Sequence, residues 1–202
     1  MKKKILIISG GQSKERLISI QTGNQVYKEL KKNGYKVKNC EPDHQLVDLV
    51  KSFNPKIIFN ALHGRYGEDG CVQGLLNILD IPYTHSGVLA SALAMDKPVA
   101  KRLMRDVGIK VADHQIVTRE EMTNTGVMDA PFVIKPLNEG SSVGVSIIHE
   151  NDHFDLAAVE WSYGEQVMVE KYIAGRELTV AVMGDLALDV TEIDSQHGFY
   201  DY

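Results

Sequence analysis

The segment whose residues most clearly indicate ligand binding is rich in glycine and serine and directly follows a lysine. Lys135 ends an apolar run, and Gly140, Ser141, Ser142 and Gly144 come within the next nine residues. Amide and hydroxyl donors in such a loop, together with an ammonium group, can converge on one anion. We predict a lid over phosphate groups; the alternative is an ordinary hairpin tip. The G-x-x-x-x-G-K-[ST] order of another common phosphate-binding loop is missing.

A second polar segment, ALHGRYGEDG, follows the apolar run at residues 57–62. It surrounds His63, Glu68 and Asp69 with three glycines, and its spacing is not that of a zinc site. If the run is a strand of an open α/β sheet, this segment lies at the carboxyl edge where such sheets bind ligands. His63 is therefore a candidate ligand-facing residue. The alternative is a long turn in which the two acids precede a helix N-terminus.

The first apolar run leads into SGGQSKERLIS, where Gly10 and Gly11 can let backbone amides approach a ligand. The full G-x-G-x-x-G fingerprint is absent, which disfavours a dinucleotide site. Glu15 and Ser19 lie four residues apart and so share one helical face. The carboxylate of Glu15 could hold a substrate ammonium there; solvated surface residues are the alternative.

Two further segments carry charged candidates. Lys97 opens a predicted helix and is weak evidence alone. In VMVEKYIAGRELTV, Glu170 ends one predicted strand and Glu177 opens the next, with Lys171 and Ile173 in the turn region between them. Such a connection can offer backbone hydrogen bonds to an adenine edge and a carboxylate to ribose hydroxyls. A charged hairpin is the alternative.

The elements that must position these groups change in character along the chain. Up to about residue 90, short β-branched runs alternate with helical patterns, as in a parallel sheet with crossover helices. Strands are predicted at Lys4–Ser9, Tyr35–Asn39, Ile57–Leu62 and Ile81–Thr84, and helices from Ile18 toward Gly34, at Gln45–Phe53 and at Val72–Leu79. This half predicts an α/β domain.

A second unit is predicted to begin around residues 86–96. Asp96 can cap a helix that ends at Gly108, and Thr118 with Glu121 makes a capping box. Antiparallel strands are predicted at Phe132–Lys135, Val145–Ile148, Gln166–Glu170, Glu177–Met183 and Leu186–Val190, with a further helix near Asp152–Trp161. This half predicts an α+β unit. Its last residues, SQHGFYDY, complete no element, so we expect the chain to be cut short.

Composition excludes several classes of protein. Of 202 residues, 44% are hydrophobic and 24% charged, which is typical of a globular chain and not of a disordered one. The apolar runs fall far short of the ~20 residues of a membrane helix, and the N-terminus lacks a signal-peptide pattern, so we expect a soluble, cytoplasmic protein without membrane partners. A net charge of -5 argues against general nucleic-acid binding. Cys40 and Cys71 are expected to be packing thiols, and Trp161, Met168 and Met183 core residues.

In order along the chain, SKERLIS, ALHGRYGEDG, MDKPVAK, IKPLNEGSSVG, EKYIAGREL and FYDY resemble the motif series of the D-alanine–D-alanine ligases, members of the ATP-grasp superfamily. The resemblance runs over the whole chain. It implies an N-terminal α/β substrate domain with a parallel sheet at residues 1–93. An α+β ATP-grasp central subdomain at 94–172 and the incomplete start of the C-terminal ATP-grasp subdomain at 173–202 would follow.

The resemblance also implies roles for individual residues. Glu15 matches the carboxylate that anchors the ammonium of the first D-alanine, Ser141 the hydroxyl linked to it, and His63 the imidazole near the reacting carboxylate. We take Glu15 and Ser141 as catalytic candidates. The remaining matches concern ATP: Lys97 and Lys135 for its phosphates, Ser142 in the loop over them, Glu170, Lys171 and Ile173 for adenine, and Glu177 for ribose.

The activity implied is ATP-dependent joining of two D-alanines through an acyl phosphate, for peptidoglycan precursor synthesis. The family's Mg2+ ligands would lie beyond residue 202, so we expect no metal site in this chain and little turnover by it. A homodimer is implied as well. The alternatives left open are a non-catalytic fragment that binds ATP or an amino acid, and a ligase that uses D-lactate or D-serine as second substrate.

Overall fold

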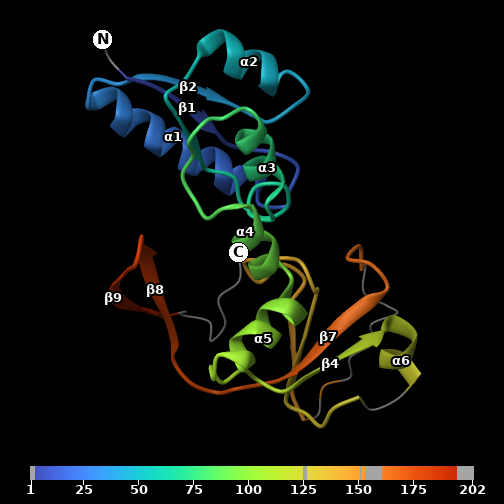
Figure 1. Ribbon diagram of the computed structural model, residues 1–202. Coiled ribbons are helices and arrows are strands. Elements are labelled where there is room, and N and C mark those ends of the chain that lie inside the picture. Colours follow the sequence, from blue (N-terminus) through green and yellow to red (C-terminus); the bar gives the residue numbers. More distant parts are fainter. Residues whose placement is uncertain (1–2, 125–126, 151, 153–160, 195–202) are drawn as a thin grey trace. The chain divides into compact units, whose positions relative to one another are not determined.

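The computed structural model describes residues 3–124, 127–150, 152 and 161–194. The chain forms two compact units, Met1–Leu103 and Met104–Tyr202 (Figure 1). The predicted helix near Asp152–Trp161 and the terminal SQHGFYDY fall mostly or wholly outside the described residues. The finer division at residues 93/94 and 172/173 stays a prediction.

The first unit is built on a parallel sheet with strand order β2-β1-β3. In chain order its elements are β1 Lys4–Ile8, α1 Arg16–Lys32, β2 Lys36–Cys40, α2 Leu46–Phe53, β3 Ile57–Asn60, α3 Cys71–Ile78, α4 Val88–Met95 and the start of α5 Lys97–Asp106. Parallel strands need crossover connections, and α1 and α2 supply them. The α/β fold predicted for this half is confirmed.

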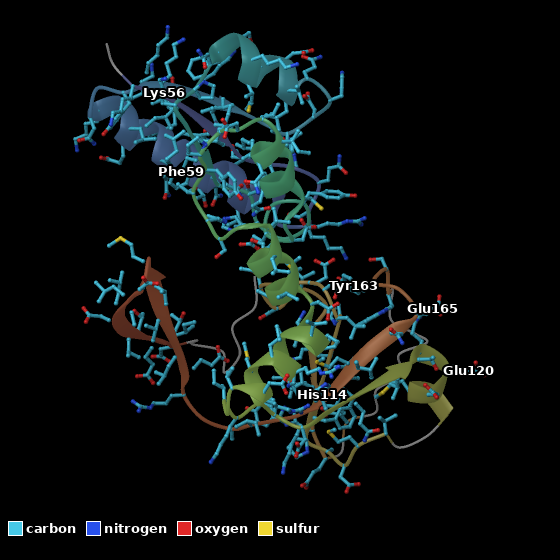
Figure 2. All side chains as sticks on the ribbon, in the orientation of Figure 1. Lys56, Phe59, His114, Glu120, Tyr163 and Glu165 are labelled. Atoms are coloured by element: carbon cyan, nitrogen blue, oxygen red, sulfur yellow. The ribbon has the colours of Figure 1, made fainter. Side chains whose placement is uncertain are left out.

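Helices cover both faces of this sheet. On one face Leu6 and Ile58 pack with residues of α2 and α3, among them Val50 and Leu76. On the other face Ile7 and Val37 form a smaller cluster, against which Val26, Tyr27, Leu30 and Phe59 pack (Figure 2 labels Phe59). Because both faces are buried, β1 is nearly continuous in apolar residues.

Two expectations about the first unit are wrong. Ile81–Thr84 is not a strand: it makes a single parallel bridge between Tyr83 and Ile58, because Pro82 has no N–H to extend a ladder. Cys71 is exposed and so is not a packing thiol, whereas burial raises the pKa of the Cys40 thiol to about 11.

Helix α4 was not predicted, because its almost uniformly apolar sequence has no helical period.

The second unit contains a four-stranded antiparallel sheet of order β4-β7-β5-β6 and a separate β8–β9 hairpin. The elements are β4 His114–Thr118, α6 Arg119–Asn124, β5 Phe132–Lys135, β6 Ser146–Ile148, β7 Gln166–Lys171, β8 Glu177–Met183 and β9 Leu186–Ile193. The sheet buries Phe132, Ile134, Ile148, Val167 and Val169 on one face. The predicted antiparallel arrangement is confirmed, although β4 was not identified as a strand.

Local sequence signals position helices α5 and α6. Thr118 Oγ1 accepts the Glu121 N–H at 3.1 Å, and the Glu121 carboxylate accepts the Thr118 N–H at 2.7 Å, which is the predicted capping box. Asp96 accepts the Val99 N–H at 3.0 Å and caps α5 as predicted. Met168 is fully buried as expected, but Met183 is 67% exposed on β8, so the prediction that it is a core residue is wrong.

Candidate active site

The first group of candidates is held where α1 begins beside the loop that follows β3. Glu15 directly precedes α1 and is only 5% exposed, and Ser19, one turn later, is fully buried. The alternative that these are solvated surface residues is therefore wrong. A Cβ placed on Gly64 would lie 2.9 Å from Glu15 Oε2, so the carboxylate lies against the His63 loop. The structure thus brings Glu15 and the His63 loop together.

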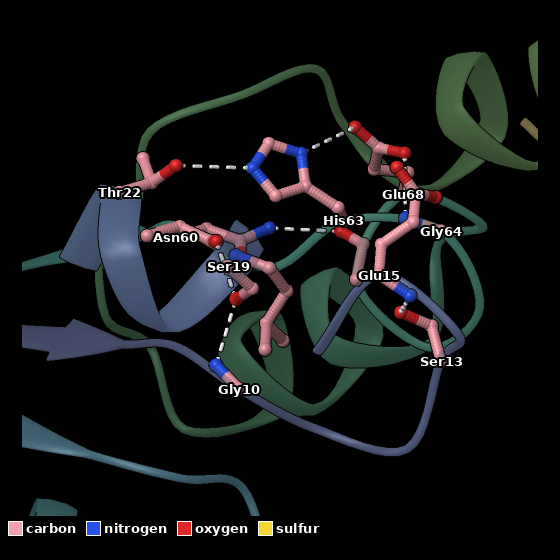
Figure 3. Close-up of polar contacts among 12 residues, drawn as sticks. Gly10, Ser13, Glu15, Ser19, Thr22, Asn60, His63, Gly64 and Glu68 are labelled. Carbon is pink, nitrogen blue, oxygen red and sulfur yellow. Dashed lines mark hydrogen bonds and ion pairs between the residues drawn. The ribbon is translucent and has the colours of Figure 1, made fainter. Parts of the chain in front are cut away.

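Ser19 joins the two loops that carry the candidates. Its hydroxyl donates to the Ala61 carbonyl at 2.7 Å and accepts the Gly10 N–H at 2.7 Å (Figure 3). One side chain on α1 therefore ties the chain after β1 to the chain after β3. The sequence indicated its proximity to Glu15 but not this bridging role.

Replacing Ser19 with alanine is expected to lower the free energy of unfolding by about 2 kcal/mol, because a buried donor and a buried acceptor both lose their partner. Urea denaturation followed by circular dichroism measures the change. Ser52, whose exposed hydroxyl contacts Leu49 O at 3.2 Å, is the matched control, and S52A is expected to have little effect. Equal stability of the S19A and S52A variants would contradict the bridging role.

His63 lies between groups from two elements (Figure 3). Its Nε2 is 3.3 Å from Thr22 Oγ1 on α1, and its Nδ1 is 3.8 Å from Glu68 Oε1 in its own loop. Polar contact with the Glu68 carboxylate raises the pKa of His63, partial burial opposes the rise, and the charge of Glu15 adds to it. Burial alone would raise the pKa of Glu68, but contacts with His63 and the Gly64 N–H outweigh burial and lower it. The pair favours an imidazolium beside a carboxylate.

This pair predicts a pH window of stabilisation. A raised His63 pKa contributes stability that is complete below its ordinary value of 6.5 and is lost as pH rises through the raised value. A lowered Glu68 pKa contributes stability that is complete above 4.5 and is lost as pH falls through the lowered value. The free energy of unfolding of the Glu68→Gln variant is therefore expected to fall furthest below that of the original chain between about pH 4.5 and 6.5.

The same variant should bring the pKa of His63 down toward its ordinary value. Proton NMR of the imidazole over pH 4–9 measures this, and E29Q on the exposed side of α1 is a control that removes one charge elsewhere. An unchanged His63 titration in the E68Q variant would show that the two groups do not interact.

Thr22 is a contact residue that the sequence reasoning missed. It lies seven residues after Glu15 and three after Ser19, so the three polar residues form one stripe along α1. A search for polar residues at i, i+4 and i+7 in an otherwise apolar helix face would have found it.

A cavity of about 300 Å³ also lies at the carboxyl edge of this sheet. It is lined by Gly11, Pro42, Leu62, Arg65 and Tyr66, among others. Neither Glu15 nor His63 lines it. The polar cluster around Glu15 and His63 is therefore distinct from this cavity. It is formed by the polar residues of α1 and the glycine-rich loop after β3.

The second group of candidates lies on the sheet of the second unit. Lys135 on β5 and Glu170 on β7 form a close ion pair, with side-chain exposures of 19% and 13%. Both alternate with core residues along their strands, so they lie on the face opposite the apolar cluster, together with the fully buried Met168. The structure thus brings together Lys135, which is predicted to bind phosphate, and Glu170, which is predicted to bind adenine.

The other nucleotide candidates lie around the ends of these strands. Lys171 ends β7, and its N–H donates to Asp113 O at 2.8 Å. Ile173 is 65% exposed beyond the strand, and the exposed Glu177 opens β8. No hydrogen bond or ion pair joins these three residues to one another or to Lys135 in the described part of the chain. Their nucleotide roles stay predictions.

The glycine–serine loop has a constrained backbone. Ser141 and Ser142 both have positive φ, at 49° and 59°, and Val143 and Val145 each close a tight turn with N–H···O bonds of 3.0 and 3.1 Å. A Cβ on Gly144 would lie 2.7 Å from the Tyr163 ring (Figure 2 labels Tyr163), so the loop packs closely there. Lys97 and Glu15 belong to the first unit, so their predicted cooperation with Lys135 and Ser141 stays a prediction.

The described residues contain neither a metal-binding cluster nor a membrane-spanning helix. No group of three or more His, Cys, Asp or Glu side chains in residues 3–124, 127–150, 152 and 161–194 could hold a metal ion. In that same part of the chain, every helix is too short or too polar to cross a membrane.

An α/β unit with a buried carboxylate beside an imidazole, followed by an antiparallel unit with a half-buried lysine, agrees with an ATP-grasp ligase, the class of the solved structures that this chain resembles. Family models described as "D-ala D-ala ligase N-terminus" and "D-ala D-ala ligase C-terminus" match residues 41–86 and 103–202. The chain belongs to the D-alanine–D-alanine ligase family.

Individual relatives are similar to this chain over 98–100% of its length. D-alanine–D-alanine ligases of Parvibaculum lavamentivorans and Paramagnetospirillum magneticum are 51% and 49% identical, and the alignments cover 99% and 100% of this chain and 66% and 67% of those proteins. A solved Bacillus anthracis D-alanine–D-alanine ligase has a TM-score of 0.77 at 33% identity, covering 98% of this chain and 69% of that one. The same enzyme complexed with ATP gives 0.79 at 32% identity, covering 98% and 68%. The chain spans about two thirds of the length of these relatives.

Proposed function

We propose that this protein joins two D-alanines with hydrolysis of ATP to ADP and phosphate, supplying a peptidoglycan precursor. The observation that carries the proposal is the buried Glu15 carboxylate at the start of α1, beside His63 and Gly64. A buried carboxylate suits an ammonium partner because a charged hydrogen bond is stronger where water is excluded. The ATP-bound relative and the ligase names of the relatives support the choice of substrates.

The chemistry requires activation, because a carboxylate at neutral pH is a poor electrophile. A carboxylate oxygen of the first D-alanine attacks the γ-phosphorus of ATP, the bond to the bridging oxygen breaks, and ADP leaves. The amine of the second D-alanine, having lost a proton, attacks the acyl carbon, and phosphate leaves. Each step is one that positioning and cationic groups accelerate.

The chain's own residues have distinct parts in this proposal. Glu15 binds the ammonium of the first D-alanine, and Ser141 is linked to it. His63 lies near the reacting carboxylate, where the imidazolium favoured by Glu68 offsets negative charge. Lys97, Lys135 and Ser142 bind phosphate, and Glu170, Lys171, Ile173 and Glu177 bind the nucleoside. Mg2+, when bound, would offset the negative charge of the phosphates, and no group of side chains among the described residues fits a site for it.

The test compares the 202-residue chain with a version extended to the length of its relatives. We expect phosphate release and D-alanyl-D-alanine from the extended protein, and little turnover by the 202-residue chain. Calorimetry should still detect ATP and D-alanine binding by the shorter chain. An extended protein that is inactive with D-alanine under all conditions, yet active with D-lactate or D-serine as second substrate, would reassign the specificity.

A homodimer in the cytoplasm, where ATP is plentiful, is part of the same proposal. Sedimentation velocity of the extended protein tests the association, and a single monomeric species at micromolar concentration would contradict it.

A further inference from the structure

The peptide group between Gly67 and Glu68 is held from both sides. Its carbonyl oxygen accepts hydrogen bonds from Asn60 Nδ2 and Gln73 Nε2, each at 2.8 Å. Its N–H donates to Gly64 O at 2.9 Å. Hydrogen bonds therefore hold both polar atoms of this peptide group and restrain its rotation. They also fix the position of the Glu68 Cα atom.

The restrained peptide positions the acid that faces His63. From its fixed Cα, the Glu68 side chain places Oε2 at 2.7 Å from the Gly64 N–H and Oε1 at 3.8 Å from His63 Nδ1. The Asn60 side chain points toward this loop in Figure 3. A change at the Gly67 carbonyl would thus be transmitted through one residue to the His63–Glu68 pair.

Gln73 is an unusual residue for its place in the fold. It is fully buried on α3, between Val72 and Leu76, which belong to the apolar cluster of the first unit. No donor among the described residues reaches its Oε1. A buried acceptor without a protein partner destabilises a fold, and an apolar side chain of similar volume would avoid that cost. The amide is therefore better explained by what its Nε2 holds than by core packing.

We propose that Gln73 is a positioning residue whose amide, through the Gly67 carbonyl, aligns Glu68 with His63 at the site that binds the first D-alanine. The part that concerns D-alanine rests on the proposed function. Asn60 shares the carbonyl, but it also accepts the Leu62 N–H and its own N–H donates to Thr84, so its replacement would disturb more than this contact. Among the residues that the structure describes, the Gln73 side chain makes one hydrogen bond, from Nε2 to Gly67 O.

The test uses Gln73→Met, which keeps the length of the side chain, and Gln73→Leu as a second apolar variant. We expect both to unfold at the same temperature as the original chain or higher, because the buried acceptor is gone. We expect the His63 pKa, measured by proton NMR, to fall toward its ordinary value as Glu68 loses alignment. Calorimetry should show D-alanine binding weakened by about three- to tenfold, which is the effect of one neutral hydrogen bond on a binding constant.

Leu76→Met is the matched control, since it also changes a fully buried side chain on α3. It should leave the His63 pKa and D-alanine binding unchanged. The proposal is overturned if Q73M and Q73L leave both of these unchanged, or if both variants fail to fold, since the amide would then serve the fold itself. Should the original chain not bind D-alanine, the proposed function fails, and the His63 titration alone decides on Gln73.

Discussion

Replacing Glu15 with glutamine is expected to weaken D-alanine binding by at least about 100-fold, or roughly 2.7 kcal/mol. The amide keeps the shape of the side chain but removes the negative charge that would pair with an ammonium. The effect should be large because Glu15 is 5% exposed, so that little water screens the interaction. Calorimetric titration of the 202-residue chain with D-alanine measures it.

The matched control is Glu29→Gln, on the same helix but in an exposed pair with Lys32. It removes the same net charge and should leave the D-alanine dissociation constant within twofold of the original. L-alanine provides a second comparison, which measures how selective the binding is. If the E15Q variant bound D-alanine as tightly as the E29Q variant, Glu15 would be a structural residue of the α1 N-terminus and no substrate ligand.

Helices and strands whose apolar residues repeat with a regular helical or strand spacing are predicted from the sequence. Elements without such a spacing are missed. The apolar run of β1 and the stop at Gly34 gave the first strand and helix to within one or two residues. Helix α4 is nearly all apolar and β4 begins with polar residues, so neither shows its period. Each has a partner from elsewhere in the chain, since β4 pairs with β7 and α4 contacts α3.

The candidate site divides in the same way. Glycine-flanked polar residues such as His63 are visible in sequence because their chemistry is local. Contacts that depend on register between distant elements are not visible: Lys135 and Glu170 are 35 residues apart and meet only because β5 pairs with β7. Gln73 is hidden for a further reason, since a glutamine within an apolar helical pattern reads as a surface position until the loop beneath it is known.

Replacing Lys135 with methionine is expected to weaken ATP binding by about 100-fold, because a partly desolvated ammonium is worth several kcal/mol to a phosphate partner. The same change removes the ion pair with Glu170, whose side chain is 13% exposed. Loss of a largely buried pair should lower the free energy of unfolding by about 2 kcal/mol. ATP titration by calorimetry and urea denaturation measure the two effects separately.

The double variant K135M/E170Q separates binding from stability. Removing the Glu170 charge as well should restore part of the lost stability, because no carboxylate is then left on that face without the Lys135 ammonium. ATP binding should not recover, since neither replacement supplies a cation. K110M, at an exposed lysine of the same unit, should change neither quantity. Recovery of ATP affinity in the double variant would mean that Lys135 acts only by neutralising Glu170, and that the phosphate ligand lies elsewhere.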